Sequence, residues 1–377
     1  LAIPLFLVTM FLVFAITFGP IGNFLRDGAE WLISDLLAGG LTTFLHNVNA
    51  SEWAESLVID GIIGGVGSVI SFLPQIVLLF TLLSLLEDSG YMARAAFIMD
   101  KLLRCIGLSG RAFVPMLMGF GCTVPAVMGT RILESEKDKK LTILITPFMS
   151  CSAKMPVYLL MVSMFFKDRG PLVIFGIYIL GVVIAILTAL LFKSTVLKGK
   201  NSPFVMELPP YRLPSAKTLL LHIWERVRDF LVRAGTVLMG ASILIWFLQS
   251  FNFSLQMVES DESILASIGM LIAPVFTLCG FGDWRASVSL VTGIAAKESV
   301  ASTMAVLYGG SLTGAFSTLS AFSFLVFVLL YTPCVAALTA MRKEFGSRKW
   351  MAVSVVYQLA VAWIMSFAVF QIGSLFI

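Results

Sequence analysis

Charged residues are scarce in this sequence. Only 13% of its 377 residues are Asp, Glu, Lys or Arg, whereas 58% are hydrophobic. Soluble globular domains carry about 25% charged residues, so this chain lacks the polar surface that a water-soluble globule of its length needs. The apolar residues occur in long runs such as 5–18 and 321–330. Because roughly 20 mostly apolar residues can cross a bilayer as a helix, the composition predicts a membrane protein.

Other features are missing as well. The apolar runs do not alternate with polar residues as the strands of a membrane β-barrel do, which leaves the α-helix as the spanning structure. No basic patch is interleaved with aromatic residues, so we predict no nucleic-acid partner. The five cysteines are scattered at positions 105, 122, 151, 279 and 334, a spacing that does not indicate a disulfide framework.

Signs of enzymatic chemistry are equally weak. The two histidines, His46 and His222, lie outside the predicted spans, which argues against a histidine-based metal enzyme in the membrane. Lys154 and one of the two serines before it, Ser150 and Ser152, could form a Ser–Lys catalytic pair, but no Gly-x-Ser-x-Gly sequence accompanies them. No Gly-x-x-x-x-Gly-Lys-Ser/Thr phosphate-binding loop occurs in the chain. We therefore predict that this chain is not an enzyme.

The apolar pattern predicts an all-α polytopic membrane protein with about seven or eight transmembrane helices and two re-entrant or broken hairpins. The predicted spans are 2–19, 61–86, 141–166, 171–192, 233–251, 321–341 and 350–372. Two further apolar stretches, 112–130 and 286–308, are interrupted by Gly, Pro, Cys or charged residues. These two stretches predict broken or re-entrant helices rather than continuous spans.

The basic residues predict the orientation of the chain. Three segments between spans are rich in Lys and Arg and should face the cytoplasm: 131–140, 193–233 and 342–349. The acid-rich segment 20–60 and the segment 251–284, which has no Lys or Arg, should lie outside. The turn 167–170 contradicts this pattern, because it should lie outside and yet contains two basic residues.

The order of segments predicts an internal inverted repeat. Each half contains a span, an amphipathic segment, a broken segment and two further spans, and the halves enter the membrane from opposite faces. Such repeats with paired broken helices mark transport sites near the bilayer midplane, although chance similarity of apolar stretches stays an alternative. The predicted organisation is a first helix with an external amphipathic segment (1–60), a first repeat (61–192), a cytoplasmic linker with an amphipathic helix (193–232) and a second repeat (233–377).

Residues with chemical potential gather at the helix breaks of the first half. Gly and Pro around Cys122 should open the helix, and the following span is unusual because it combines two prolines, two serines, a cysteine and a lysine. A charged residue within a span is a functional candidate, whereas a lone cysteine is often only a small buried hydrophobe. The candidates are Gly121, Cys122, Thr123, Pro125, Ser150, Cys151, Ser152, Lys154, Met155 and Pro156.

The second half holds similar residues at corresponding places. The candidates there are Thr292, Lys297, Glu298, Tyr331, Thr332, Pro333 and Cys334. Cys151 and Cys334 occupy corresponding spans, which favours a shared path for both. Thiolate and thioether ligands suit metals such as Fe, Cu and Zn. Lys154 would repel a cation, so we predict that it gates the path or pairs with Glu298.

A charged group lies at the predicted cytoplasmic end of span 61–86. It consists of Glu87, Asp88 and Arg94. One interpretation is a capped turn at the membrane interface; the other is a gating or docking element for a cytoplasmic domain.

These sequences together resemble the membrane domain of the ferrous iron transport protein B family over essentially the whole chain. The resemblance is carried by 86–97 (LEDSGYMARAAF), 119–125 (GFGCTVP), 150–158 (SCSAKMPVY), 293–298 (GIAAKE) and 331–334 (YTPC). It implies Fe²⁺ uptake across the bacterial inner membrane by a multi-pass protein, with paired gate regions at 112–158 and 286–337. It also implies that Cys122, Cys151 and Cys334 line the iron path.

The resemblance also implies partners. Members of the family carry a GTPase domain, which would bind GTP and Mg²⁺, ahead of the first span. The chain begins at Leu1 inside an apolar stretch, so we expect that domain to be missing from it. Small cytoplasmic accessory proteins and a homo-oligomer are further expectations. The alternative function is a transporter of nucleosides or other small organic solutes with the same gate architecture.

Overall fold

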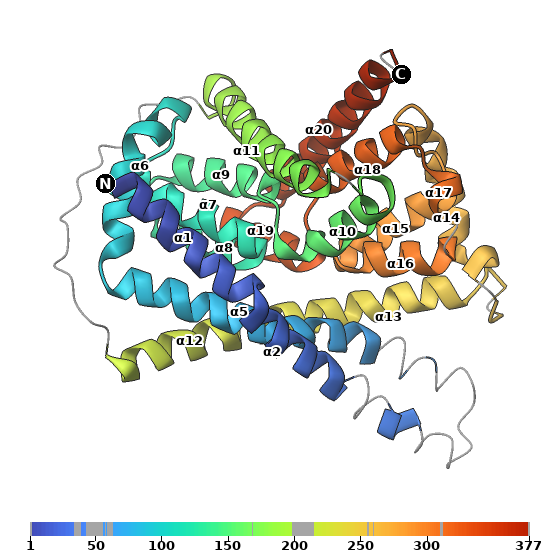
Figure 1. The fold of residues 1–377 in the computed structure, drawn as a ribbon, viewed down its shortest axis with the longest axis horizontal. Coiled ribbons are helices and arrows are strands. Elements are labelled where there is room, and N and C mark those ends of the chain that lie inside the picture. Colours follow the sequence, from blue (N-terminus) through green and yellow to red (C-terminus); the bar gives the residue numbers. More distant parts are fainter. Residues whose placement is uncertain are drawn as a thin grey trace. The chain divides into compact units, whose positions relative to one another are not determined.

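The computed structural model describes residues 2–33, 39–42, 56, 58, 63–167, 169–197, 215–254, 256–258, 260–309 and 312–375. Parts of the predicted external segment 20–60 and of the predicted linker 193–232 lie outside these residues. Within the described residues the chain is helical (Figure 1), and the only strand-like pairing is one bridge between Phe251 and Met257. The prediction of an all-α fold is confirmed.

The chain divides into two compact units. Unit 1 comprises Leu1–Ile143 and Ala189–Ile243, and unit 2 comprises Leu144–Thr188 and Leu244–Ile377. The two units are defined by which residues pack together, whereas the predicted repeats are defined by the order of segments along the chain. The predicted domain boundaries therefore stay a prediction.

Unit 1 is built around a bent pair of helices, α5 and α6. The helices of this unit are α1 (Ala2–Phe18), α2 (Pro20–Trp31), α5 (Gly64–Asp88), α6 (Tyr91–Ile106), η3 (Gly110–Ala112), α7 (Phe113–Gly121), α8 (Thr123–Gly129), η4 (Thr130–Ile132), α12 (Ala216–Phe230) and η7 (Leu231–Gly235). The pair bends by 82° at Gly90, whose φ of 79° is left-handed and favours glycine. Leu79, Met92 and Met118 form the core that joins α5, α6 and α7.

Unit 2 surrounds α18, which is buried along most of its length. Its helices are η5 (Thr146–Phe148), η6 (Ser152–Lys154), α10 (Met155–Phe165), η8 (Ser260–Glu262), α14 (Ile264–Thr277), α15 (Trp284–Ala295), α16 (Ser299–Tyr308), α17 (Leu312–Ala315), α18 (Thr318–Leu330), α19 (Val335–Phe345) and α20 (Arg348–Ser374). Ser323 of α18 joins Ser366 of α20 through their hydroxyls at 2.7 Å and donates to the Cys279 carbonyl at 2.8 Å. These bonds satisfy polar groups that would otherwise be costly to bury.

Three helices have residues in both units. They are α9 (Glu136–Ile145), α11 (Gly170–Ser194) and α13 (Thr236–Ser250). α11 follows the predicted span 171–192, whereas α9 ends early in the predicted span 141–166 and α13 is shorter than the predicted span 233–251.

Among the residues that the structure describes, five helical stretches are long and apolar enough to cross a membrane, or six if the bent pair α5–α6 is one span. They are Val8–Trp31, Glu136–Phe165, Gly170–Ser194, Thr318–Phe345 and Arg348–Ser374. The prediction of a polytopic helical membrane protein is confirmed, while the count of seven or eight spans stays a prediction. The predicted span 233–251 forms the 15-residue helix α13, which is shorter than a bilayer-crossing helix usually is.

Candidate functional site

All three candidate cysteines occupy the same local position. Each lies in extended backbone directly before a helix: Cys122 (φ −152°, ψ 133°) before α8, Cys151 (φ −75°, ψ 157°) before η6 and Cys334 (φ −62°, ψ 159°) before α19. None of the three side chains accepts a capping hydrogen bond from its helix. A helix N-terminus favours negative charge, so each position suits a thiolate that binds a metal cation.

In unit 1 the break at Cys122 confirms that the stretch 112–130 is not a continuous helix. α7 ends at Gly121 and α8 begins at Thr123. A Cβ at position 121 would overlap the end of the Leu79 side chain of α5, so glycine allows the two helices to approach without a shift of Leu79. Pro125 stands in the first turn of α8, where it needs no intrahelical partner for the amide hydrogen that it lacks.

In unit 2 the predicted span 321–341 is also interrupted, and Pro333 explains how. The carbonyl of Leu329 would normally accept a hydrogen bond from the backbone N–H of residue 333. Proline has no N–H, so α18 ends and the Leu329 carbonyl can accept a hydrogen bond from a different donor. The ammonium of Lys154 donates to it at 2.6 Å.

Lys154 is therefore held by backbone oxygens rather than by a carboxylate. It is 2% exposed, and its ammonium also donates to the Pro147 carbonyl at 3.4 Å. No ion pair with Glu298 is formed in the described part of unit 2. The hypothesis that Lys154 pairs with Glu298 is not supported, because a helix end offers a buried cation closer acceptors.

Lys297 has an equivalent arrangement. It is 3% exposed and lies in the break between α15 and α16. Its ammonium donates to the Thr332 carbonyl at 2.6 Å and lies 3.0 Å from the centroid of the Tyr331 ring. A carbonyl dipole and an aromatic face both attract a cation. Two lysine ammoniums thus donate to backbone carbonyls in the stretch that precedes Pro333.

The two unit 2 cysteines belong to the same cluster. Electrostatic interactions link Lys154 and Lys297 with Cys151 and Cys334, and they link Glu298 with Cys334. The prediction that Cys151 and Cys334 share one environment is consistent with this cluster.

Two oxygens of the cluster have no partner. The Tyr331 hydroxyl and the Thr332 hydroxyl are buried and make no hydrogen bond to any described residue. Tyr331 is 1% exposed and Thr332 is 2% exposed. Leaving a buried polar group unpaired costs about 1–3 kcal/mol. The break after α18 therefore offers two uncommitted oxygens beside a thiol, which is a donor set suited to a transient cation.

Other predicted residues support the cluster rather than enter it. The Ser150 hydroxyl bonds the Tyr158 hydroxyl at 2.9 Å, and the Tyr178 hydroxyl donates to the Met155 sulfur at 3.6 Å. Thr292 bonds the Thr303 hydroxyl at 3.2 Å and joins α15 to α16. Ser152 begins η6 and Pro156 lies in the first turn of α10. The candidate residues named from the sequence did not include Tyr158 or Tyr178, although Tyr158 ends the sequence 150–158 that carries the family resemblance.

Gly293 fixes the approach of Tyr331 to α15, and this gives a testable prediction. A Cβ at position 293 would overlap the Tyr331 hydroxyl and Val300. We expect Gly293→Ala to lower the free energy of unfolding by about 1–3 kcal/mol, as overpacking does. Gly176→Ala on α11 is the matched control, because nothing lies within 4 Å of that position. Thermal unfolding in detergent checks the difference, and equal midpoints for the two variants would contradict it.

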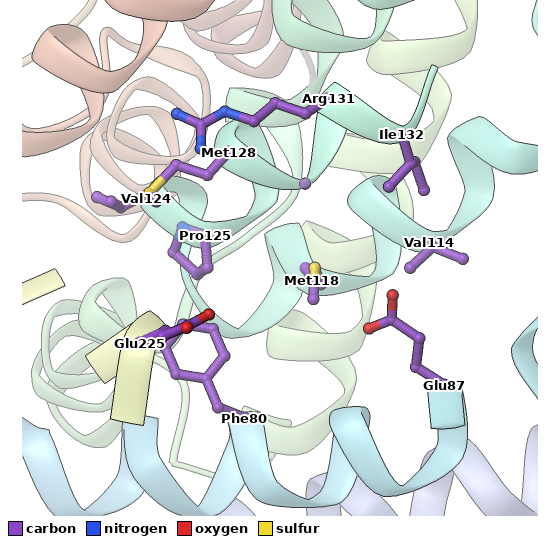
Figure 2. A pocket seen from close by; sticks show the side chains of 11 residues that line it. Phe80, Glu87, Val114, Met118, Val124, Pro125, Met128, Arg131, Ile132 and Glu225 are labelled. Atoms are coloured by element: carbon purple, nitrogen blue, oxygen red, sulfur yellow. The ribbon is translucent and has the colours of Figure 1, made fainter. Parts of the chain in front are cut away.

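The charged residues at the α5–α6 bend have local roles. The Arg94 guanidinium donates to the Gly90 carbonyl at 3.2 Å, and Asp88 ends α5. Glu87 is exposed and lines a cavity in unit 1 (Figure 2). The Arg94 bond fits a capped turn, and both the capped turn and a docking role for the three residues stay predictions.

The described residues contain no group of three or more His, Cys, Asp and Glu side chains that could hold a metal ion. The thiols, hydroxyls and carbonyls of unit 2 thus form a sparse donor set. Passage of an ion requires sites that bind weakly enough to release it.

Two known families match this chain, and one of them matches two separate segments that each contain helix breaks. The family described as "Nucleoside recognition" matches residues 69–165 and 231–348. The family described as "Ferrous iron transport protein B C terminus" matches residues 174–226. The first match contains Cys122 and Cys151, and also Cys334 in its second segment.

Several curated relatives are similar over most of this chain. A protein named Fe(2+) transporter FeoB from Staphylococcus aureus (strain MSSA476) is 43% identical over the whole chain, which covers 58% of that protein. A protein of the same name from Methanocaldococcus jannaschii is 42% identical over 89% of the chain and 52% of its own length. A Porphyromonas gingivalis protein named Fe(2+) transport protein A/Fe(2+) transporter FeoB fusion protein is 39% identical, with the whole chain covering 50% of it. The chain thus spans about half the length of these relatives. No solved structure matches the chain.

Proposed function

The chain belongs to the gate-containing membrane domains of the ferrous iron transport protein B family, and on that premise we propose that it carries Fe²⁺ across the bacterial inner membrane. The observation that carries this proposal is the cluster in unit 2. It combines the thiols of Cys151 and Cys334 with the two unpartnered hydroxyls of Tyr331 and Thr332. Thiolate and oxygen donors together suit a borderline metal such as Fe²⁺ better than Mg²⁺ or Ca²⁺, which prefer oxygen alone.

Iron would pass through unit 2 by exchanging ligands between the helix breaks. Cys334 and Cys151 would act as soft ligands, and Glu298 would offset part of the positive charge of the cargo. Cys122, at the equivalent break of unit 1, would bind the same cargo there. Gly121, Thr123 and Pro125 would shape that break, as Pro147 and Pro156 do beside Cys151.

The two lysines would close the path in the resting state. Their ammoniums already occupy the carbonyls of Leu329 and Thr332, which are oxygens that a passing cation would otherwise use. A cation can reach these carbonyls only if the lysine ammoniums move away from them. Lys154 and Lys297 therefore act as tethered cations that exclude other ions until the breaks rearrange.

The whole protein would include parts that this chain does not contain. The relatives are longer, and we propose that a GTPase domain using GTP and Mg²⁺ precedes the first span. The fused relative from Porphyromonas gingivalis supports a small cytoplasmic accessory protein as a partner. We also propose a multi-pass orientation with the basic segments in the cytoplasm and a homo-oligomeric assembly.

Anaerobic uptake of Fe²⁺ into proteoliposomes tests the proposal. We expect purified full chain to transport Fe²⁺, with no inhibition by a large excess of nucleoside. Empty liposomes and liposomes with boiled protein are the controls. The description "Nucleoside recognition" favours the alternative substrate, so the same vesicles are assayed for uptake of labelled nucleoside. Nucleoside uptake without Fe²⁺ uptake would replace the proposed function with that alternative.

A further inference from the structure

A cavity of about 260 Å³ lies in unit 1, outside the cluster described above. Its walls come from α5, α7, α8, η4 and α12 (Figure 2). α7 and α8 are the two helices that flank Cys122, so the cavity adjoins the first helix break. Much of the wall is apolar, and its polar side chains are Glu87, Arg131 and Glu225.

The donors that line this cavity are of two kinds. Figure 2 shows the carboxylates of Glu87 and Glu225 entering from opposite sides, from α5 and α12, with the sulfur atoms of Met118 and Met128 above Phe80. Both glutamates are exposed, whereas Met118 is buried. A Cβ at Gly129 would lie 3.3 Å from the Met118 sulfur, so glycine leaves room for the thioether.

The charges of the wall favour a cation. Two carboxylates outnumber the single guanidinium of Arg131, and Glu87 lies in the last turn of α5, where the helix dipole is negative. Carboxylates bind hydrated divalent cations through their water shells, while thioethers attract softer transition metals.

The size of the cavity permits a hydrated cation. A water molecule occupies about 30 Å³ in the liquid, so a cation with six waters needs roughly 180 Å³. The cavity can hold such an ion with its hydration shell. The two glutamates, on opposite walls, would bind this shell rather than chelate a bare ion.

We propose that this cavity is a vestibule for a hydrated divalent metal cation, with Glu87 and Glu225 as its anionic walls and Met118, one helical turn before Cys122, as a soft contact. The inference rests on the proposed function and adds a second site to it. The Met118 carbonyl accepts the backbone N–H of Cys122 at 2.9 Å, so the thioether residue and the cysteine belong to one turn. Arg131 begins the basic segment 131–140, which places the vestibule on the predicted cytoplasmic side, where cargo would leave.

The role of α12 follows from this assignment. This helix lies along α5 and belongs to the predicted linker between the repeats. Glu225 is its contribution to the vestibule. The linker would then complete a binding site and not merely connect the two repeats.

Binding of Mn²⁺ to the purified full chain in detergent tests the proposal by electron paramagnetic resonance of the free ion. Mn²⁺ is the probe because it prefers carboxylate over thiolate ligands. We expect Glu87→Gln/Glu225→Gln to weaken binding by about tenfold or more, since a carboxylate near a divalent ion contributes appreciably even in a water-like dielectric. Arg131→Gln should strengthen binding by about threefold. Glu136→Gln, which removes an exposed carboxylate of α9 outside the cavity, should change nothing.

The outcomes separate the vestibule from the proposed function. Opposite shifts in the glutamate and arginine variants, with the control unchanged, support the vestibule. Equal Mn²⁺ binding by the wild type and the double glutamate variant overturns the vestibule. A loss of binding in Glu136→Gln as large as that in the double glutamate variant overturns it too. Fe²⁺ uptake by the wild type is measured in parallel, so transport with unaltered Mn²⁺ binding in every variant rejects the vestibule and leaves the proposed function intact.

Discussion

Replacing Cys151 and Cys334 together with Ser is expected to lower Fe²⁺ uptake by about 10- to 100-fold or more. Loss of a group that merely orients a metal ligand already costs about 10–100-fold in affinity or activity, and here the soft ligands themselves are removed. Serine keeps the size of the side chain but substitutes a hydroxyl that binds Fe²⁺ less well than a thiolate. The measurement is anaerobic uptake into proteoliposomes at matched protein content.

The two cysteines outside the candidate set provide controls for this experiment. Cys279 is buried in unit 2, and its thiol lies 3.9 Å from the Trp363 carbonyl, outside the cluster. Cys105 is exposed in unit 1. Each is expected to retain uptake when changed to Ser. Undiminished uptake by the Cys151→Ser/Cys334→Ser variant would remove the thiols from the mechanism and assign transport to Glu298, the hydroxyls and the backbone oxygens.

Cys122 allows the contribution of unit 1 to be measured separately. Cys122 and Cys334 both have extended backbone before a helix, but their φ values differ, −152° before α8 and −62° before α19. The second broken segment has Ala296 in a similar extended conformation (φ −140°, ψ 126°). The two broken segments therefore share a backbone but not a thiol.

The sequence predicted the helix breaks because glycine and proline act locally. Gly121 and Pro125 around Cys122 predicted that α7 and α8 would be separate helices, and this is confirmed. The spans 141–166 and 321–341 were predicted as continuous and are interrupted as well. Pro147, Pro156 and Pro333 were the available signals, but the long apolar runs on either side outweighed them in the prediction.

The partners of the lysines could not be predicted, because they depend on distant contacts. The acceptor of Lys154 lies 175 residues away in the sequence and is a backbone carbonyl, which has no residue type to recognise. Charge complementarity suggested Glu298 instead. The proline at position 333 could have identified the Leu329 carbonyl as unpaired, but only the fold shows which donor reaches it.

That reasoning gives the second large effect, a stability coupling between Lys154 and Pro333. Lys154→Met should lower the free energy of unfolding by about 1–3 kcal/mol, because the buried Leu329 carbonyl loses its donor. Pro333→Ala supplies a backbone N–H four residues after Leu329, where a helix would place the missing donor. Alone it competes with Lys154 for the carbonyl. In the double variant with Lys154→Met, the new backbone N–H can donate to the Leu329 carbonyl in place of the lysine. The free energy of unfolding of the double variant is therefore expected to exceed the value predicted by adding the two single effects by about 1 kcal/mol or more.

A matched cycle distinguishes this coupling from a general effect of proline. Pro274 lies within α14 of the same unit, and Pro274→Ala combined with Lys154→Met should be additive within about 0.5 kcal/mol. Unfolding midpoints in detergent supply all the values. Additivity in the Lys154–Pro333 cycle would show that the lysine does not depend on the unpaired carbonyl. Because Lys154→Met also removes a tethered cation from the path, its Fe²⁺ uptake should exceed that of the wild type, and a lower uptake at normal stability would make the lysine a part of conduction instead of its barrier.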